Sequence, residues 1–236
     1  MPLDERNVVS EHVLEIRYRA FGALLDIRGR IADAVAAKGQ MSVWSITDSR
    51  VDFKPTDEDE REIGFVSHRN IGYVVRTPDT RQYMHDRAMR FIRDVFAVDG
   101  YKLPDVVRFG FRSQILFPTR DSFAGLLKKT SERMPQPKQL TEVFDAQIED
   151  YGQIVVLKRG ETHIRVRGGP MQSAQAKTET SLGAQKDRIP EVGFFLDLDH
   201  WRTNPGPMDE RKISALLQQS NDSAWKAASA YHDILI

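Results

Sequence analysis

Six arginines stand at strand-like spacing in three separate segments of the chain. They are Arg17, Arg19, Arg108, Arg112, Arg165 and Arg167. Apolar residues alternate with them, so in β-strands these arginines would share the face that is turned away from the core. A guanidinium carries a rigid fork of donors that suits carboxylate and phosphate groups. The pattern predicts an arginine-bearing sheet face that can meet an acidic protein or a nucleic acid.

Acidic residues have the parity to share the same face. They are Glu15, Asp145, Glu149, Asp197 and Asp199. Cross-strand ion pairs are common on exposed sheets and contribute little to stability there. The simplest interpretation is therefore a lattice of solvated ion pairs, with a protein-binding surface as the second interpretation and a nucleic-acid surface as the third.

The run Asp197, Asp199 and His200 allows a metal-dependent hydrolase as a further hypothesis. Two carboxylates at positions i and i+2 of a strand project to one side and can hold a hard cation such as Mg²⁺. No further ligand or general base is marked nearby, and the arginines compete for these carboxylates. We therefore predict neither a metal nor another cofactor.

Motifs of the common catalytic sites are missing from the sequence. It contains no cysteine, no phosphate-binding loop, no dinucleotide-binding glycine fingerprint and no nucleophile elbow. Its six histidines form no H-x-x-x-H pair. A nuclease-type Glu-x-Lys motif is broken because Val156 stands two positions before Lys158. The sequence therefore favours a binding role over an enzymatic one.

Composition and charge narrow the class of protein. The 236 residues are 40% hydrophobic and 29% charged, as in ordinary globular proteins, and the formal net charge is zero. A dedicated nucleic-acid-binding protein usually carries a surplus of positive charge. The first residues form no secretory signal, and no run approaches the roughly 18 apolar residues of a membrane span. We expect a cytoplasmic protein with no membrane partner.

Hydrophobic periodicity predicts the element order β-α-β-β-β-β-α twice, over residues 1–100 and over residues 101–236. Strands are expected at 13–20, 41–47, 50–54, 62–67 and 71–77, and again at 106–115, 142–150, 153–159, 161–167 and 192–199. Two local similarities accompany this order. IGYVVRT at 71–77 matches VGFFLDL at 192–198, and EIRYR at 15–19 matches RFGFR at 108–112. We predict two similarly built halves.

Two features distinguish the second half. Residues 168–190 are polar, small and without periodicity, so we expect a mobile insertion there. The final helix, about 27 residues long, exceeds the usual length of a globular helix. Trp225 falls off its apolar stripe, and we expect this side chain to be exposed as a possible partner contact.

These elements predict an α+β fold, since strands joined by tight turns form an antiparallel sheet whose apolar face the helices must cover. We expect all helices on one face. The element order resembles the helix-grip and TATA-binding-protein-like folds. The segments VVRFGFRSQILFP at 106–118 and GFFLDLDHW at 193–201 also resemble a sporadically distributed, uncharacterised bacterial family. That resemblance implies a fold and no chemistry.

The leading functional hypothesis is a non-enzymatic binding or scaffold component of a bacterial multi-protein assembly, such as an accessory or defence-type system. It predicts a protein partner or self-association. The alternatives are nucleic-acid binding through the arginines, metal-dependent hydrolysis at Asp197 and Asp199, and a cup that holds a small apolar ligand between the sheet and the long helix. Such a cup requires a cavity of a few hundred Å³.

Overall fold

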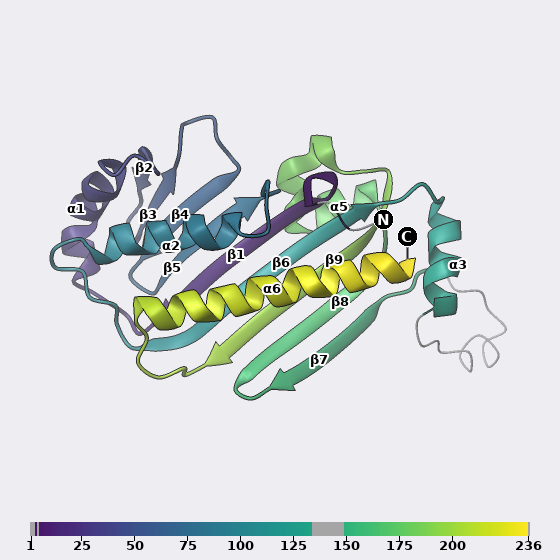
Figure 1. Ribbon diagram of the computed structural model, residues 1–236. Coiled ribbons are helices and arrows are strands. Elements are labelled where there is room, and N and C mark those ends of the chain that lie inside the picture. The colour runs from purple at the N-terminus through teal and green to yellow at the C-terminus, as the bar shows by residue number, and fades with distance from the viewer. Residues whose placement is uncertain (1–2, 4, 134–148, 236) are drawn as a thin grey trace.

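The computed structural model describes residues 3, 5–133 and 149–235, and these form an α+β fold with one nine-stranded antiparallel sheet (Figure 1). The first half contains η1 (Glu5–Asn7), β1 (Val9–Tyr18), α1 (Leu24–Ala36), β2 (Val43–Ile46), β3 (Arg50–Lys54), β4 (Glu62–Ser67), β5 (Asn70–Arg76) and α2 (Tyr83–Phe96). The second half contains β6 (Val106–Pro118), α3 (Phe123–Arg133), β7 (Gln153–Arg159), β8 (Thr162–Gln172), α5 (Ser173–Glu179), η2 (Ser181–Arg188), β9 (Val192–Thr203) and α6 (Glu210–Leu235).

The two halves meet at the centre of the sheet, where β1 pairs with β6. The strand order is β2-β3-β4-β5-β1-β6-β9-β8-β7, so the last strand of each half flanks its own first strand. The predicted element order of the first half is confirmed. In the second half, residues 142–148 of the expected strand 142–150 lie outside the described residues, and Glu149 and Asp150 are not in a strand.

The local sequence similarities between the halves do not fall at equivalent positions of the sheet. They would equate Glu15 with Arg108 and Gly72 with Gly193. In the structure Glu15 lies opposite Gly72, whereas Arg108 lies opposite Thr203. Gly193 instead lies opposite Pro118. The two segments of each similarity belong to corresponding strands, but their registers differ, so the similarities reflect strand composition rather than a matched position.

The long helices pack on one face of the sheet. Figure 1 shows α2 and α6 lying across it, with α1 near β2 and α3 near the opposite end. Alternation along β1 and β6 places the fully buried residues Leu14, Ile16 and Phe111 on this covered face, which confirms the predicted parity of these strands. Of the helices that the structure describes, none combines the length and the apolar character that a membrane span requires.

The expected mobile insertion at 168–190 is instead ordered secondary structure. β8 continues to Gln172, and α5 and η2 follow it. Leu182 and Ala176 pack with Leu116 and Phe195, which point away from the covered face because Ile115 and Phe194 point toward it. The segment therefore forms a small second core on the opposite face, and the prediction that all helices share one face is wrong for α5 and η2.

Side-chain hydrogen bonds also hold this segment in place. Gln114 on β6 accepts hydrogen bonds from the backbone N–H of Ser181 at 3.0 Å and from its hydroxyl at 2.6 Å. Gln185 donates to the backbone carbonyl of Ser10 at 2.9 Å and accepts from the Thr77 hydroxyl at 2.7 Å. Polar sequence without periodicity is thus compatible with a docked segment when its partners are backbone and amide groups.

Candidate binding face

The face of the sheet opposite α2 and α6 carries the predicted arginines, and we call its central part the open face. It is formed by Glu15 and Arg17 on β1, Arg108, Gly110 and Arg112 on β6, Asp197, Asp199 and Trp201 on β9, and His163, Arg165 and Arg167 on β8. The register fixes this grouping, because each position lies opposite a residue of the same parity on the next strand. Residues from both halves of the chain therefore form one surface.

Arg112 and Asp197 form the tightest ion pair of the open face. The guanidinium Nε and Nη2 atoms each lie 2.8 Å from a carboxylate oxygen of Asp197, in a bidentate arrangement. The Asp197 carboxylate is almost fully buried, with 2% of its side chain exposed, whereas 45% of the Arg112 side chain is exposed. Its hydrogen bond to Asp197 raises the pKa of Arg112 above the usual value. The pair anchors β6 to β9.

Asp199 is shared between two arginines at longer range. Arg108 Nη2 lies 3.5 Å and Arg165 Nη2 lies 3.8 Å from its Oδ2 atom. Burial raises the pKa of Asp199, the neighbouring arginines oppose this effect, and the charge of Asp197 adds to it. One carboxylate thus faces two guanidinium groups that it does not fully engage.

The remaining arginines differ in their surroundings. Arg17 forms an ion pair of 2.8 Å with Glu15 on its own strand. Arg167 is exposed and lies opposite Asp197, but in the described part of the chain it has no carboxylate within ion-pair distance. Arg19 was predicted on the same face; it lies beyond the end of β1, which stops at Tyr18, and so stands outside the lattice.

An aromatic pair borders this charged lattice. The rings of Trp201 and His163 stack with centroids 5.2 Å apart and planes 16° apart. Gly110 lies opposite Trp201 on β6, and a side chain there would meet only ordinary van der Waals contacts. The Arg108 guanidinium lies 3.8 Å from the place where a Cβ atom of residue 110 would stand, so the charged lattice reaches the position opposite the indole.

His200 does not join Asp197 and Asp199 on the open face, as the metal-site hypothesis would require. β9 continues to Thr203 instead of ending at Asp199, so alternation turns His200 to the covered face, where only 2% of it is exposed. Its Nε2 atom lies 3.3 Å from the Ser223 hydroxyl, and burial lowers its pKa to about 4. With both carboxylates engaged by arginines, this geometry is that of an ion-pair lattice.

The described part of the molecule also offers no set of side chains that could hold a metal ion. Among these residues there is no group of three or more histidine, aspartate or glutamate side chains placed to hold an ion. Near His200, the space enclosed between α6, β8 and β9 measures only about 20 Å³, which is room for a single water molecule. This space is smaller than the few hundred Å³ that the alternative of a cup for an apolar ligand requires.

Trp225 is buried, so the prediction that it is exposed is wrong. Only 1% of it is accessible, and its ring lies 5.3 Å from that of His12 and 5.8 Å from the Arg81 guanidinium. The cause is that α6 packs against both the sheet and α2, so its buried stripe is wider than a one-sided helix would need. Trp225 is a core residue rather than a partner contact.

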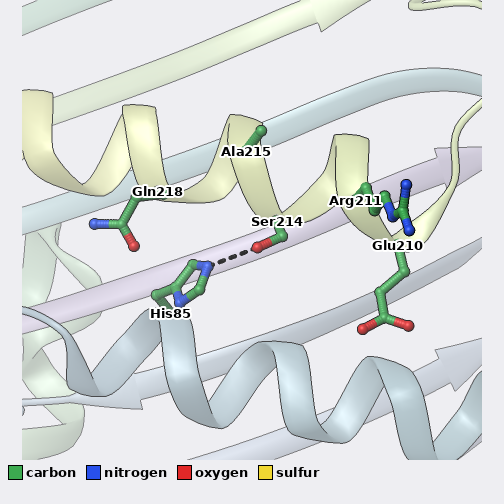
Figure 2. Close-up of a pocket in the computed structure, with 6 residues that line it drawn as sticks. All are labelled: His85, Glu210, Arg211, Ser214, Ala215 and Gln218. Atoms are coloured by element: carbon green, nitrogen blue, oxygen red, sulfur yellow. Dashed lines mark hydrogen bonds between the residues drawn. The ribbon is translucent and has the colours of Figure 1, made fainter.

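A second polar site lies in a groove of about 480 Å³ between α2 and α6 (Figure 2). His85 Nε2 is 2.9 Å from the Ser214 hydroxyl, and its Nδ1 is 3.2 Å from Asp86. These three residue types form catalytic triads elsewhere. Here Ser214 lies within α6, where backbone N–H groups bond to the preceding turn and cannot form an oxyanion hole. The contact therefore joins two helices.

Two features of these sites, Trp201 and the His85–Ser214 contact, are not indicated by the sequence patterns described above. Trp201 has the same parity as Asp197 and Asp199. A predicted strand that ran two residues beyond Asp199 would have placed it on the same face. The His85–Ser214 contact joins residues 129 positions apart, and no local pattern indicates it.

No protein-family model, curated protein or solved structure matches this chain.

Proposed function

We propose that this protein is a non-enzymatic binding component of a multi-protein assembly, and that its open face receives an acidic segment of a protein partner. The observation that carries the proposal is the charge imbalance of the open face. Five arginines lie there with the carboxylates of Glu15, Asp197 and Asp199; Glu11, which shares their face, is paired with Arg76 on β5 and leaves the imbalance unchanged. The ion pairs hold the guanidinium groups in place, and the surplus positive charge is left for a ligand.

The composition of the open face favours a protein over a nucleic acid. Arginine and tryptophan are enriched among the residues that dominate protein–protein binding energies, and Trp201 adjoins the lattice, opposite Gly110 on β6. Asp197, Asp199 and Glu15 would repel a phosphate backbone, whereas a peptide can place its carboxylates selectively. The formal net charge of zero also provides no general attraction for nucleic acid.

The proposal is tested with two fluorescent probes: a short glutamate-rich peptide that contains apolar residues, and a DNA duplex. We expect the peptide to bind the full chain at low salt. Arg167→Glu should weaken its binding about five- to tenfold, because an attraction is replaced by a repulsion. Arg167 is the informative position since reversing its charge breaks no ion pair with a described residue.

Arg90→Glu on the solvent-exposed side of α2 is the matched control, because it makes the same charge change on the helix-covered side of the molecule. Unchanged peptide affinity in Arg167→Glu, or an equal loss in Arg90→Glu, contradicts the proposal. Duplex binding that is tighter than peptide binding and falls steeply with salt would establish the nucleic-acid alternative instead.

A further inference from the structure

The outermost strand of the second half, β7, presents an apolar edge. It follows the lower rim of the sheet in Figure 1, and among the described strands it pairs only with β8. Three of its side chains belong to the most exposed large apolar residues of the described chain: Ile154 at 66%, Val156 at 60% and Leu157 at 50% exposed. Exposed apolar side chains next to unpaired backbone groups are a template for another strand.

β7 has few of the features that normally prevent an edge strand from pairing with another chain. It runs for seven residues without proline or glycine, and its register with β8 is continuous. Its charged residues, Lys158 and Arg159, stand together at the C-terminal end. The opposite edge of the sheet, β2, has only four residues. The two edges therefore differ in length, and the apolar side chains of β7 are more exposed than Trp44 and Ile46 of β2.

We propose that β7 pairs with β7 of a second copy of this chain, antiparallel about a two-fold axis at Val156. In that register Val156 faces its own equivalent, Val155 faces Leu157, and Ile154 faces Lys158. No two like charges lie opposite each other, and Val155, Val156 and Leu157 of the two copies meet in the centre. A two-fold axis makes such a contact self-complementary, because each residue pair occurs twice.

Pairing of this kind joins two nine-stranded sheets into one and satisfies the edge groups of both copies. A seven-residue strand on each side makes an interface smaller than the usual 1,200–2,000 Å² of stable complexes, so we expect a weak dimer at about micromolar concentrations. The inference uses β7 alone and does not depend on the arginines of the open face.

Sedimentation of the full chain over a range of concentrations tests the proposal. The wild-type protein should change from monomer to dimer with rising concentration. Val156→Lys and Val156→Glu should each remain monomeric, because two equal charges then face each other on the axis. An equimolar mixture of the two variants should dimerise again, because lysine now faces glutamate. Since Val156 is largely exposed, both variants are expected to fold.

Ile46→Lys on β2 is the control, as it puts the same charge on the other edge strand and should leave dimerisation unchanged. A wild-type dimer that persists in Val156→Lys overturns the proposal, as does a mixture of the two variants that stays monomeric. A wild-type monomer at all concentrations also overturns it. If its β7 amides are nevertheless protected from hydrogen exchange, the edge is occupied within the same chain.

Discussion

Replacing Glu62 with alanine is expected to lower the free energy of unfolding by about 3 to 5 kcal/mol. Only 3% of Glu62 is exposed, on the covered face of β4, where it lies opposite Val75 of β5. Its carboxylate accepts hydrogen bonds from Arg87 Nε at 2.8 Å, from the Tyr83 hydroxyl at 2.6 Å and from the Tyr73 hydroxyl. Gln40 extends the network by donating to the Tyr73 hydroxyl at 3.0 Å. The alanine variant leaves a partly buried guanidinium without its counter-charge.

The protonation behaviour of Glu62 agrees with this role. Burial alone would raise its pKa, but the hydrogen bonds from Arg87, Tyr73 and Tyr83 outweigh this effect and hold the pKa below its usual value. The carboxylate is therefore charged at neutral pH and forms the centre of a network that joins β4, β5 and α2. Removing either Glu62 or Arg87 would leave the other charge without its partner away from water, which is energetically costly.

Urea unfolding measures the effect at neutral pH. Glu62→Gln keeps one acceptor oxygen and should lose less stability than Glu62→Ala. Glu58→Ala, on an exposed loop, is the control and should change the free energy of unfolding by no more than about 0.5 kcal/mol. A loss below about 1 kcal/mol for Glu62→Ala would show that the network does not carry the stability we assign to it.

Acidification is expected to destabilise the protein through two buried histidines. Burial lowers the pKa of His12 to about 3 and that of His200 to about 4, from an unfolded value of 6.5. His12 is fully buried beneath α6, with Nδ1 2.7 Å from the Ser113 hydroxyl and Nε2 3.3 Å from the Ser10 hydroxyl. Below pH 6.5 the unfolded chain therefore binds protons that the folded chain does not.

This difference in bound protons determines the direction in which stability changes with pH. Stability is fully present above pH 6.5 and falls as the pH drops toward the folded pKa values, by about 1.4 kcal/mol per pH unit for each histidine. At pH 4.5 the two histidines together should cost about 5 kcal/mol, which is comparable to the whole stability of many domains. Unfolding free energies at a series of pH values test this slope.

His12→Gln separates the contribution of one histidine from other acid effects. In this variant the free energy of unfolding should change less steeply with pH between pH 4.5 and 6.5, by about 1.4 kcal/mol per pH unit. This difference in slope is expected whatever the stability of the variant at pH 7. His200→Gln should reduce the slope in the same way down to about pH 4. His85→Gln, at the surface groove, is the control. A slope that is the same in wild type and His12→Gln would contradict the assignment.

The fold class, the order of the first-half elements and the open face follow from local patterns in the sequence. Alternation in 13–20 and 106–115 assigns Leu14, Ile16 and Phe111 to one face and the arginines to the other, and this assignment depends only on neighbouring residues. The ion pair between Arg112 and Asp197 also depends on the register between β6 and β9, which are distant in the sequence. Parity within each strand is sufficient to predict that both side chains lie on the same face.

Other features depend on contacts between distant segments and could not be predicted. Trp225 is buried because α2 contacts the flank of α6, and α2 is about 130 residues away in the chain. Residues 173–188 form α5 and η2 because Leu116 and Phe195 offer an apolar patch on the second face. His200 faces α6 because β9 runs further than its apolar pattern suggests.

The central pairing of β1 with β6 has a consequence for the order of events during chain synthesis. Val9 meets Leu116, so one edge of β1 stays without its neighbour until roughly a hundred more residues have been made. The cover over His12 and Ser113 comes still later, from α6 at the end of the chain. Contacts this distant in sequence are slow to form. A chain interrupted after its first half would therefore expose an apolar strand edge and be open to aggregation.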